Sequence, residues 1–377
     1  MRINVIGQNN PTGFGNHFSY FCEQLKKFSY LDSEIVEHLL IDEDAVDHLT
    51  RTASPRDINI WFYAFALHVT MKTRGRNVVW AIFEQDKLAP AYLNRLSRAD
   101  LIWTPSNWAK EILEGQGLPI GKVDLVPEGV APEIFHPFCR AWHEKRHPEI
   151  FRFLMLGKFE ARKGYAQLIE AFVKAFGKDT NVELLIKGDF FHLGREVRGA
   201  KLLDFVRRYD APNIRLLTGE VSREDLFLIY NSADAFVFPS RAEGWGLPLI
   251  EAMATGLPAL AVNYSGQTEF LKEVKGYFMP VAYKMVPIND SEYQQFALGD
   301  EGDWGRWAEA DIDDLAQKMR DMVKHYGDWR EKGLTASNIL RSKFTWTSAV
   351  NIALESLIRH GLLPHVKLQI PPSIGMR

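Results

Sequence analysis

The sequence has little cysteine, and its two cysteines, Cys22 and Cys139, stand far apart. Their spacing is neither that of a metal site nor that of a redox pair, and two cysteines cannot build a disulfide framework. A reducing compartment is the natural environment of such a chain. The sequence therefore excludes a small secreted protein that depends on disulfides.

An excess of one charge is missing as well. The net charge of the 377 residues is −3, and residues 1–140 hold 14 Lys and Arg against 17 Asp and Glu, while the remainder holds 31 of each. Because neither part is basic, a nucleic acid is a poor candidate partner.

Long apolar runs are also missing. The longest uncharged apolar stretch, residues 58–71 (INIWFYAFALHVTM), contains His68 and is too short to span a bilayer. The segment MRINVIGQNNPTGFG passes from a short apolar strand into turn residues, so we expect no signal peptide in it. The sequence predicts a cytoplasmic protein, either free or attached to the cytoplasmic face of the membrane.

The length and composition that are present indicate two globular domains. Hydrophobic residues make up 46% and charged residues 25% of the chain, and one ordinary domain is shorter than 377 residues. Residues 131–150 contain three prolines and mixed charge without a helical or strand period, which indicates a linker. We predict a first domain over 1–138, a linker over 139–150, a second domain over 151–343, and a final helix with a tail over 344–377.

Short apolar runs alternate with helical patterns in both predicted domains. We expect strands at 3–7, 58–64, 78–83, 100–105 and 122–127, and again at 151–157, 182–188, 214–219, 235–240 and 258–263. Such alternation predicts an α/β fold with parallel sheets covered by helices on both faces. In these folds ligands bind at the carboxyl ends of the strands. Residues 281–307 are polar and aperiodic, and we expect a long surface excursion there.

Residues 243–251 (EGWGLPLIE) follow an apolar strand and begin a helix. Pro248 suits the first helical turn and Gly256 suits the helix end. A helix start attracts anions, and Gly244 and Gly246 let a ligand approach the backbone. Glu243 and Glu251 then read as acceptors for sugar hydroxyls. Alternatively, Glu243 is an ordinary acid at a helix start and Glu251 a surface residue.

Three further segments would meet this one at strand ends. Lys158, Arg162 and Lys163 follow the first strand of the second domain; alternatively they are solvated loop residues. Gly13 and Gly15 stand between the first strand and the first helix, either as a phosphate loop or as a plain turn. Phe18 occupies the position of the third glycine of a dinucleotide fingerprint, which excludes a Rossmann dehydrogenase.

The fourth segment is residues 261–271 (AVNYSGQTEFL), a strand that runs into a polar turn. Glu269 is a second candidate acceptor for a hydroxyl group. Alternatively, it is an acid at a helix start.

Together these segments resemble the retaining glycosyltransferases of family 4, the group 1 glycosyl transferases. The resemblance rests on GFG (13–15), LVPEGVAPEIFHP (125–137), GKFEARKG (157–164) and SRAEGWGLPLIEAMATGLPALAV (240–262), which holds the family's pair of Glu residues separated by seven positions. It implies the GT-B fold, in which two Rossmann-like doubly wound domains face each other across a cleft. It also implies that the final helix crosses back to the first domain.

The resemblance implies a nucleoside-diphosphate sugar as the donor. Glu243, Lys163 and Lys158 would be the catalytic residues: Glu243 on the donor sugar and the two lysines on the diphosphate. Glu251 would contact the ribose hydroxyls, and the backbone of Gly15 would close on the phosphates. The full set of implied donor-binding residues is Gly13, Gly15, Arg162, Gly244, Trp245, Gly246, Leu247 and Glu251.

The acceptor side departs from the family pattern. The histidine that many members carry at a strand end of the first domain is not evident, and Glu84 and Asp86 stand there instead. Lys158 replaces an arginine of many members, and Glu128–Gly129 replaces Asn-Gly. The sequence is similar to enzymes that build bacterial surface polysaccharides or lipopolysaccharide, which implies a glycan or lipid-linked glycan as acceptor, with GDP-mannose or a UDP-hexose as donor.

We expect neither a metal nor a cofactor. Two Asp-x-Asp matches exist, Asp42–Asp44 and Asp311–Asp313, but the first lies in an acidic run and the second caps a helix. The rival interpretations are a GT-B phosphorylase or epimerase and a non-catalytic protein that binds nucleotide sugars. A phosphorylase would need a lysine for pyridoxal phosphate that the sequence does not reveal. A non-catalytic relative would have lost Lys163 or Glu243.

Overall fold

The computed structural model of this 377-residue chain describes residues 1–8, 13–28, 34–39, 51–62, 74–139, 149–189, 206–289 and 303–364. The chain divides into two compact units. The first unit comprises Met1–Gly129, Asn289–Trp304 and Phe344–Arg377, and the second comprises Val130–Ile288 and Gly305–Lys343. Each unit contains a six-stranded sheet whose neighbouring strands are parallel, as the sequence predicts for an α/β fold.

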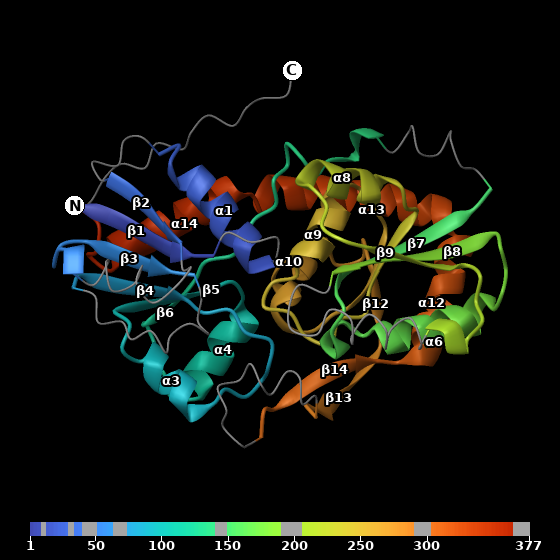
Figure 1. The fold of residues 1–377 in the computed structure, drawn as a ribbon, viewed down its shortest axis with the longest axis horizontal. Coiled ribbons are helices and arrows are strands. Elements are labelled where there is room, and N and C mark those ends of the chain that lie inside the picture. Colours follow the sequence, from blue (N-terminus) through green and yellow to red (C-terminus); the bar gives the residue numbers. More distant parts are fainter. Residues whose placement is uncertain are drawn as a thin grey trace. The chain divides into compact units, whose positions relative to one another are not determined.

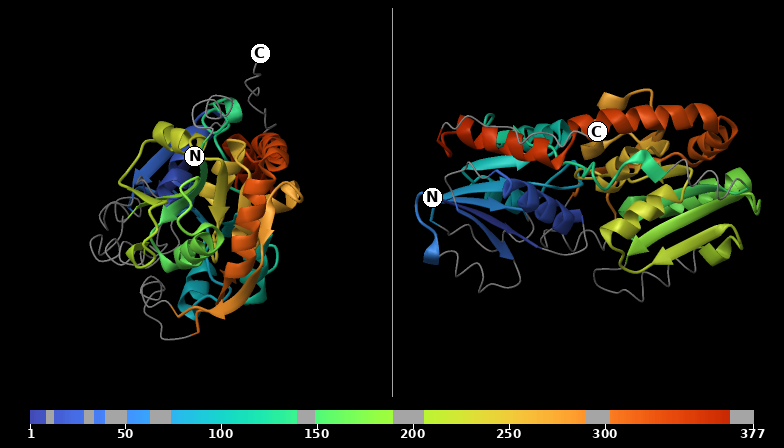
Figure 2. Two further views of the ribbon diagram at one scale, coloured as in Figure 1. Left: turned by 90° about the vertical axis from the view of Figure 1, so that its right-hand side faces the viewer. Right: turned by 90° about the horizontal axis from the view of Figure 1, so that it is seen from above.

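The sheet of the first unit has the strand order β2-β1-β3-β4-β5-β6 (Figure 1). Its strands are β1 (Arg2–Gly7), β2 (Glu34–Leu39), β3 (Ile58–Trp61), β4 (Arg76–Trp80), β5 (Leu101–Thr104) and β6 (Val123–Leu125). The helices of this unit are α1 (Gly13–Leu25), α3 (Pro90–Leu96), α4 (Asn107–Gly115) and α14 (Trp346–Arg359). Helix α1 packs beside β1 (Figures 1 and 2), and Figure 1 shows α3 and α4 on the other side of the sheet.

A shared apolar core and one polar cluster join α14 to this sheet. Side chains of α1, α14 and the alternate strand residues make the core. Within the cluster, Ser356 accepts a hydrogen bond from Trp103 Nε1 at 2.9 Å and donates one to Asp124 Oδ2 at 2.5 Å. Arg359 and His360 approach the same oxygen at 3.2 and 3.1 Å. Three side chains at the end of α14 are therefore tied to one side chain on β5 and one on β6.

Three buried asparagines cross the same sheet from strand to strand. Asn4 pairs in register with Asn59, and Asn59 with Asn77. The Asn4 amide donates to Asn59 Oδ1 at 2.8 Å, and the Asn59 amide donates to Asn77 Oδ1 at 3.3 Å and to the carbonyl of Arg74 at 3.1 Å. Because each buried amide satisfies the next, the row fixes the register of β1, β3 and β4.

The sheet of the second unit has the order β12-β11-β10-β7-β8-β9. Its strands are β7 (Phe151–Lys158), β8 (Val182–Asp189), β9 (Ile214–Thr218), β10 (Ala235–Phe238), β11 (Ala259–Val262) and β12 (Met279–Val281). Its longer helices are α6 (Tyr165–Phe176), α8 (Arg223–Asn231), α9 (Leu247–Ala254), α12 (Ile312–Lys324) and α13 (Tyr326–Lys343). Helices α6 and α12 share one apolar core with the sheet, and Figure 1 shows α8, α9 and α13 across it.

The structure differs from the sequence prediction in four elements. Strand β2 was not expected, because as an edge strand it is half exposed and carries polar residues. Strand β4 ends at Trp80 rather than Phe83. The expected excursion over 281–307 has ordered ends, since β13 (Tyr283–Pro287) pairs antiparallel with β14 (Arg306–Ala310); residues 290–302 lie outside the described residues.

Helix α13 was also missed, because Gly327 and Gly333 look like breaks. The structure explains Gly333: a β-carbon there would lie 2.7 Å from the carbonyl oxygen of Gly256. The glycine therefore allows α13 to pack closely on the end of α9. Among the helices of the described ranges, none is both long and apolar enough to cross a membrane.

The asparagine row predicts a stability effect. Asn59→Ala should lower the free energy of unfolding by more than about 2 kcal/mol, because it leaves the buried amides of Asn4 and Asn77 without their shared partner. Urea unfolding measures the change. Asn94→Ala, at an exposed position of α3, is the control and should change the free energy by less than about 0.5 kcal/mol. Equal effects of the two substitutions would contradict the role of the row.

Candidate functional site

Three loops of the second unit converge after β7, β10 and β11. The loop after β7 contains a short helical turn, Ala161–Lys163, and then Gly164 with a φ of +72°. A β-carbon on Gly164 would lie 2.3 Å from the carbonyl oxygen of Pro239. The amide of Arg241 donates to the carbonyl of Arg162 at 2.8 Å. The glycine thus lets the β7 loop touch the chain that leaves β10.

The segment EGWGLPLIE forms the predicted turn and helix. Gly246 has a φ of +101° and caps α9, and Pro248 lies in its first turn, as predicted. Gly256 has a φ of +77°; its amide donates to Met253 and that of Leu257 to Ala252, which makes a Schellman end. Pro248 has no N–H, and the amides of Leu249 and Ile250 donate to Gly246. The backbone donors toward an anion at this helix start are therefore those that precede Pro248.

Glu243 is a buried carboxylate between two cations. Only 6% of the residue is exposed. Its Oε1 lies 2.6 Å from Lys163 Nζ and accepts a hydrogen bond from the hydroxyl of Ser240, and its Oε2 lies 3.2 Å from Arg162 Nη1. Burial alone would raise the pKa of this carboxyl, but Lys163 and Arg162 together hold the pKa below its ordinary value. Glu243 is therefore ionised at neutral pH.

Arg162 binds protein groups on several sides. Its guanidinium donates to the carbonyl of Ala242 at 2.7 Å and to Glu160 Oε2 at 3.3 Å, in addition to its ion pair with Glu243. Burial raises the pKa of Glu160, but Arg162, Lys158 and Lys163 outweigh this effect and hold the pKa below its ordinary value. Lys163 is 6% and Arg162 7% exposed, so the alternative of solvated loop residues is wrong for both.

Glu251 lies in a different environment on α9. It is 4% exposed, so the alternative of a surface residue is wrong. Its Oε2 accepts a hydrogen bond from the hydroxyl of Tyr230 at 3.0 Å. Burial raises the pKa of Glu251 to about 8, against smaller lowering effects of Tyr230 and Arg223. Near neutral pH, Glu251 is mainly protonated and Glu243 ionised, although both are buried.

The loop after β11 supports the backbone of Glu243. The Glu243 amide donates to Ser265 Oγ at 2.8 Å, and its carbonyl accepts from the Gly266 amide at 2.9 Å. A β-carbon on Gly266 would lie 1.9 Å from the carbonyl oxygen of Gly244, which explains the glycine. Glu269 lies in the first turn of α10 (Thr268–Leu271) and forms an ion pair with Lys272. This arrangement matches the reading of Glu269 as an acid at a helix start.

The remaining predicted donor-binding residues of this unit have mixed surroundings. Trp245 is buried, and its ring lies 5.2 Å from that of Phe270 between centroids. Leu247 is the first residue of α9 and is also buried. Lys158 is the last residue of β7. Trp245 therefore stabilises the turn by packing.

The charged residues of this site lie together. The three cations Lys158, Arg162 and Lys163 lie near two carboxylates, those of Glu160 and Glu243.

The first unit holds the other predicted residues. Gly13 and Gly15 do not form a loop between strand and helix, because α1 begins at Gly13 and both lie in its first turn. Glu84 and Asp86 follow the end of β4; Glu84 is buried and contributes to raising the pKa of Tyr92, mainly an effect of burial. Asp86 accepts a hydrogen bond at its backbone carbonyl from Gln116 at 3.3 Å.

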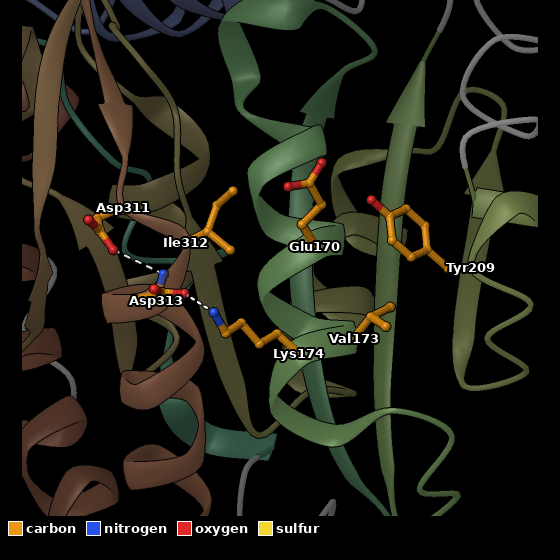
Figure 3. Close-up of a pocket in the computed structure, with 7 residues that line it drawn as sticks. All are labelled: Glu170, Val173, Lys174, Tyr209, Asp311, Ile312 and Asp313. Carbon is orange, nitrogen blue, oxygen red and sulfur yellow. Dashed lines mark hydrogen bonds and ion pairs between the residues drawn. The ribbon is translucent and has the colours of Figure 1, made fainter.

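The Asp-x-Asp match at Asp311–Asp313 lies at an open pocket between α6 and α12 (Figure 3). Asp311 caps α12, as predicted, and accepts hydrogen bonds from the amides of Asp313 and Asp314, both at 2.9 Å. Asp313 forms an ion pair with Lys174. Asp42–Asp44 lies outside the described residues. Within the described ranges, no group of three or more His, Cys, Asp or Glu is placed to hold a metal ion.

Sequence reasoning missed three side chains that shape this site. Ser240 and Ser265 bind the side chain and the backbone of Glu243, and Tyr230 binds Glu251. Ser240 is the second residue after β10 and Ser265 the third after β11, and these positions close to strand ends could have revealed them. Tyr230 lies inside a helix, and the sequence carries no signal that separates it from a core residue.

Part of this chain is similar to a known family of proteins. Residues 142–284 match the sequence model of the family Glycosyl transferases group 1. A D-inositol 3-phosphate glycosyltransferase of Paenarthrobacter aurescens is 29% identical over 184 residues, which are 45% of this chain and 42% of that protein. The serotype-specific mannosyltransferase WbdA of Escherichia coli is 34% identical over 33% of this chain and 15% of its own length. The chain thus spans less than half the length of these two relatives.

A solved structure confirms the fold class. The Anabaena protein HepE, in complex with UDP and glucose, superposes with a TM-score of 0.71 at 15% identity, over 95% of this chain and all of that one (100%). Together, the family match and this likeness confirm the resemblance to group 1 glycosyltransferases and the GT-B fold of two Rossmann-like domains.

The buried acid on α9 generates a prediction about stability and pH. Glu251→Gln should raise the melting temperature of the nucleotide-free protein, and the gain should grow above the ordinary carboxyl pKa of 4.5 and level off above about pH 8. Between these two pH values the folded state holds a proton that the unfolded chain has already released, so the unaltered protein loses stability as the pH rises, until Glu251 also ionises in the folded state. Glutamine stays neutral and still accepts from Tyr230.

Thermal unfolding at a series of pH values measures this effect. Glu224→Gln, an exposed acid on α8, is the control and should show no such rise. A difference between Glu251→Gln and the unaltered protein that stays constant over the whole pH range would contradict the assignment.

Proposed function

We propose that this chain, which carries a group 1 glycosyl transferase segment at residues 142–284, is a retaining hexosyltransferase that uses a nucleoside-diphosphate sugar. The observation that carries the proposal is the cluster of Lys163, Arg162 and Glu243 at the ends of β7 and β10. An ionised acid beside buried cations, next to a helix start, can bind sugar hydroxyls and phosphates at adjacent positions.

The proposed donor roles follow from the charges. Lys158 and Lys163 bind the diphosphate and stabilise the negative charge that grows on it as the anomeric C–O bond breaks. The amides before Pro248 contribute to the same stabilisation. Glu243 accepts a hydrogen bond from the hexose, and Glu251 accepts from the ribose. The departing phosphate takes the acceptor proton on the same face, so no protein base is needed and the anomeric configuration is retained.

The single positive charge of Lys163 can fully neutralise either Glu243 or a phosphate, but not both. In the ligand-free chain, its ammonium group already lies 2.6 Å from Glu243. We therefore propose that the diphosphate competes with Glu243 for Lys163, while Arg162 keeps Oε2. The exchange would free Oε1 of Glu243 for a hydroxyl of the sugar at the moment that the phosphate is bound.

GDP-mannose and a UDP-hexose are the proposed donors, and a hydroxyl of a glycan or lipid-linked glycan is the proposed acceptor. The name of the WbdA relative, a serotype-specific mannosyltransferase, supports a mannosyl donor, and the complex of HepE supports UDP and glucose. Glu84 and Asp86 are the proposed acceptor residues. The proposed location of the protein is the cytoplasm, at or near the inner face of the membrane.

A panel of nucleotide sugars tests the proposal. Slow hydrolysis of one donor, and faster release of its nucleotide once a glycan acceptor is added, is the expected result. An epimerase would convert the sugar without releasing nucleotide, and a sugar phosphorylase would depend on inorganic phosphate. A non-catalytic protein would bind a nucleotide sugar and leave it intact.

Substitution of Glu243 and of Glu251 tests whether the first binds the sugar and the second the nucleotide. Glu243→Ala should abolish transfer and leave the affinity for the free nucleoside diphosphate intact or tighter, because two buried cations lose their internal partner. Glu251→Ala should weaken nucleotide binding roughly 10- to 100-fold, the value of one charge-assisted hydrogen bond. Calorimetry at about pH 9, where Glu251 is ionised, measures both affinities. Equal losses in the two variants would contradict the assignment.

Chelation tests the source of positive charge. Transfer should persist in excess EDTA, because Lys158, Lys163 and the helix start are proposed to stabilise the leaving group without an ion. Lys163→Ala should lower turnover by roughly two to three orders of magnitude under the same conditions. Loss of activity on chelation, with recovery on adding magnesium or manganese, would contradict the proposed phosphate site.

A further inference from the structure

Tyr230 is a fully buried residue of α8 with a fixed ring. None of its surface is exposed. Its ring meets those of Phe135 and Phe236 edge to face, with centroids 5.9 Å apart in both cases. A tyrosine enclosed in this way needs a partner for its hydroxyl group, since an unpaired buried O–H is costly.

The hydroxyl of Tyr230 donates to Oε2 of Glu251 at 3.0 Å. Among the described residues, no other side chain or backbone group has a hydrogen bond to the carboxyl of Glu251. One oxygen of this buried acid is therefore fixed from α8, and Oε1 is left for another donor. The rigid ring of Tyr230 determines how the carboxyl group is turned.

We infer that Tyr230 is a positioning residue for nucleotide binding, because it holds one oxygen of Glu251 and leaves the other for the ribose hydroxyls of the donor. This inference rests on the proposed function, in which Glu251 receives the ribose. Tyr230 itself does not touch the nucleotide; it acts through Glu251. Its loss should therefore change how Glu251 binds and ionises rather than remove a contact to the ligand.

The ionisation of Glu251 makes this role measurable through the pH dependence of nucleotide binding. The charged and titratable groups that act on Glu251 are Tyr230 and Arg223, both on α8. The neighbouring strands β10 and β11 contribute only uncharged residues (AFVF and ALAV), and α13 meets α9 through Gly333 and Ser337. Ribose hydroxyls donate hydrogen bonds, so they favour the ionised carboxylate, and binding should release the proton that Glu251 holds below about pH 8.

The affinity for the nucleoside diphosphate should therefore rise with pH between about 7 and 9, with a midpoint near the pKa of Glu251, about 8. Tyr230→Phe keeps the ring and removes the hydroxyl. It should weaken binding roughly tenfold at about pH 8 and move the midpoint to higher pH, because the donated hydrogen bond favours the ionised acid. A merely structural role of the hydroxyl would lower the melting temperature and leave the midpoint unchanged.

The experiment is calorimetric titration of the full chain with UDP and with GDP across this pH range. Glu251→Gln should flatten the pH dependence. Tyr92→Phe, which removes a buried hydroxyl in the other unit, is the matched control and should leave both affinity and midpoint unchanged. Titration of the unaltered protein at about pH 7 in two buffers of different ionisation enthalpy should show release of close to one proton per nucleotide.

The outcomes separate this inference from the proposed function. Failure of the unaltered protein to bind either nucleotide at any pH would overturn the proposed function. Binding by the unaltered protein, together with an unchanged affinity and midpoint in Tyr230→Phe, would overturn the positioning role alone. Binding without proton release at about pH 7 would also overturn it, and this result does not depend on whether a variant folds.

Discussion

The burial of one carboxylate between two cations is the constraint on which the candidate site depends. Glu243, Lys163 and Arg162 are each less than a tenth exposed, and without the two cations burial would raise the pKa of Glu243. The local structure serves this arrangement: Gly164 allows the β7 loop to touch the chain after β10, and Gly266 allows the β11 loop to reach the backbone of Glu243. Three strand ends are joined in this way through one acid.

Such an ion pair is a poor device for stability alone, since a well-packed apolar group of similar volume often serves as well or better. In the proposed function, the ion pair keeps a cation and an ionised acid in place for the ligand. Under the same proposal Lys163, a point charge, moves from the carboxylate to a phosphate, whereas Arg162 is bound to Ala242 and Glu160 as well and stays in place. Glu251, a few residues further along the chain, is kept neutral by burial instead. The site thus holds one acid that is ionised at neutral pH and one that ionises at about pH 8.

Much of this could be predicted from the sequence because its signals are local. The alternation of apolar runs and helical patterns gave the α/β class, and Pro248 and Gly256 marked both ends of α9. Contacts between distant segments could not be predicted in the same way. The sequence singled out Lys163 and Glu243 separately, but their pairing across 80 positions depends on how two loops pack.

The remaining differences between the sequence prediction and the structure concern the burial of single residues and the groups that they contact. Glu251 could have been a surface residue until the packing of α8 was known, and Tyr230 had no distinguishing signal. Gly13 and Gly15 resembled a loop because glycine is rare in helix interiors, yet the first turn of α1 tolerates them. Edge strand β2 was missed because it carries polar residues, and helix α13 because its two glycines look like breaks; both are stabilised by neighbouring elements.

A crystal structure of the chain with a bound nucleoside diphosphate tests the central claim most directly. The account predicts a phosphate oxygen within hydrogen-bond distance of Lys163 Nζ, Arg162 still paired with Glu243, and a ribose hydroxyl on Glu251. A nucleotide bound away from these residues, or a Lys163 that remains closed on Glu243 without a phosphate contact, would contradict it.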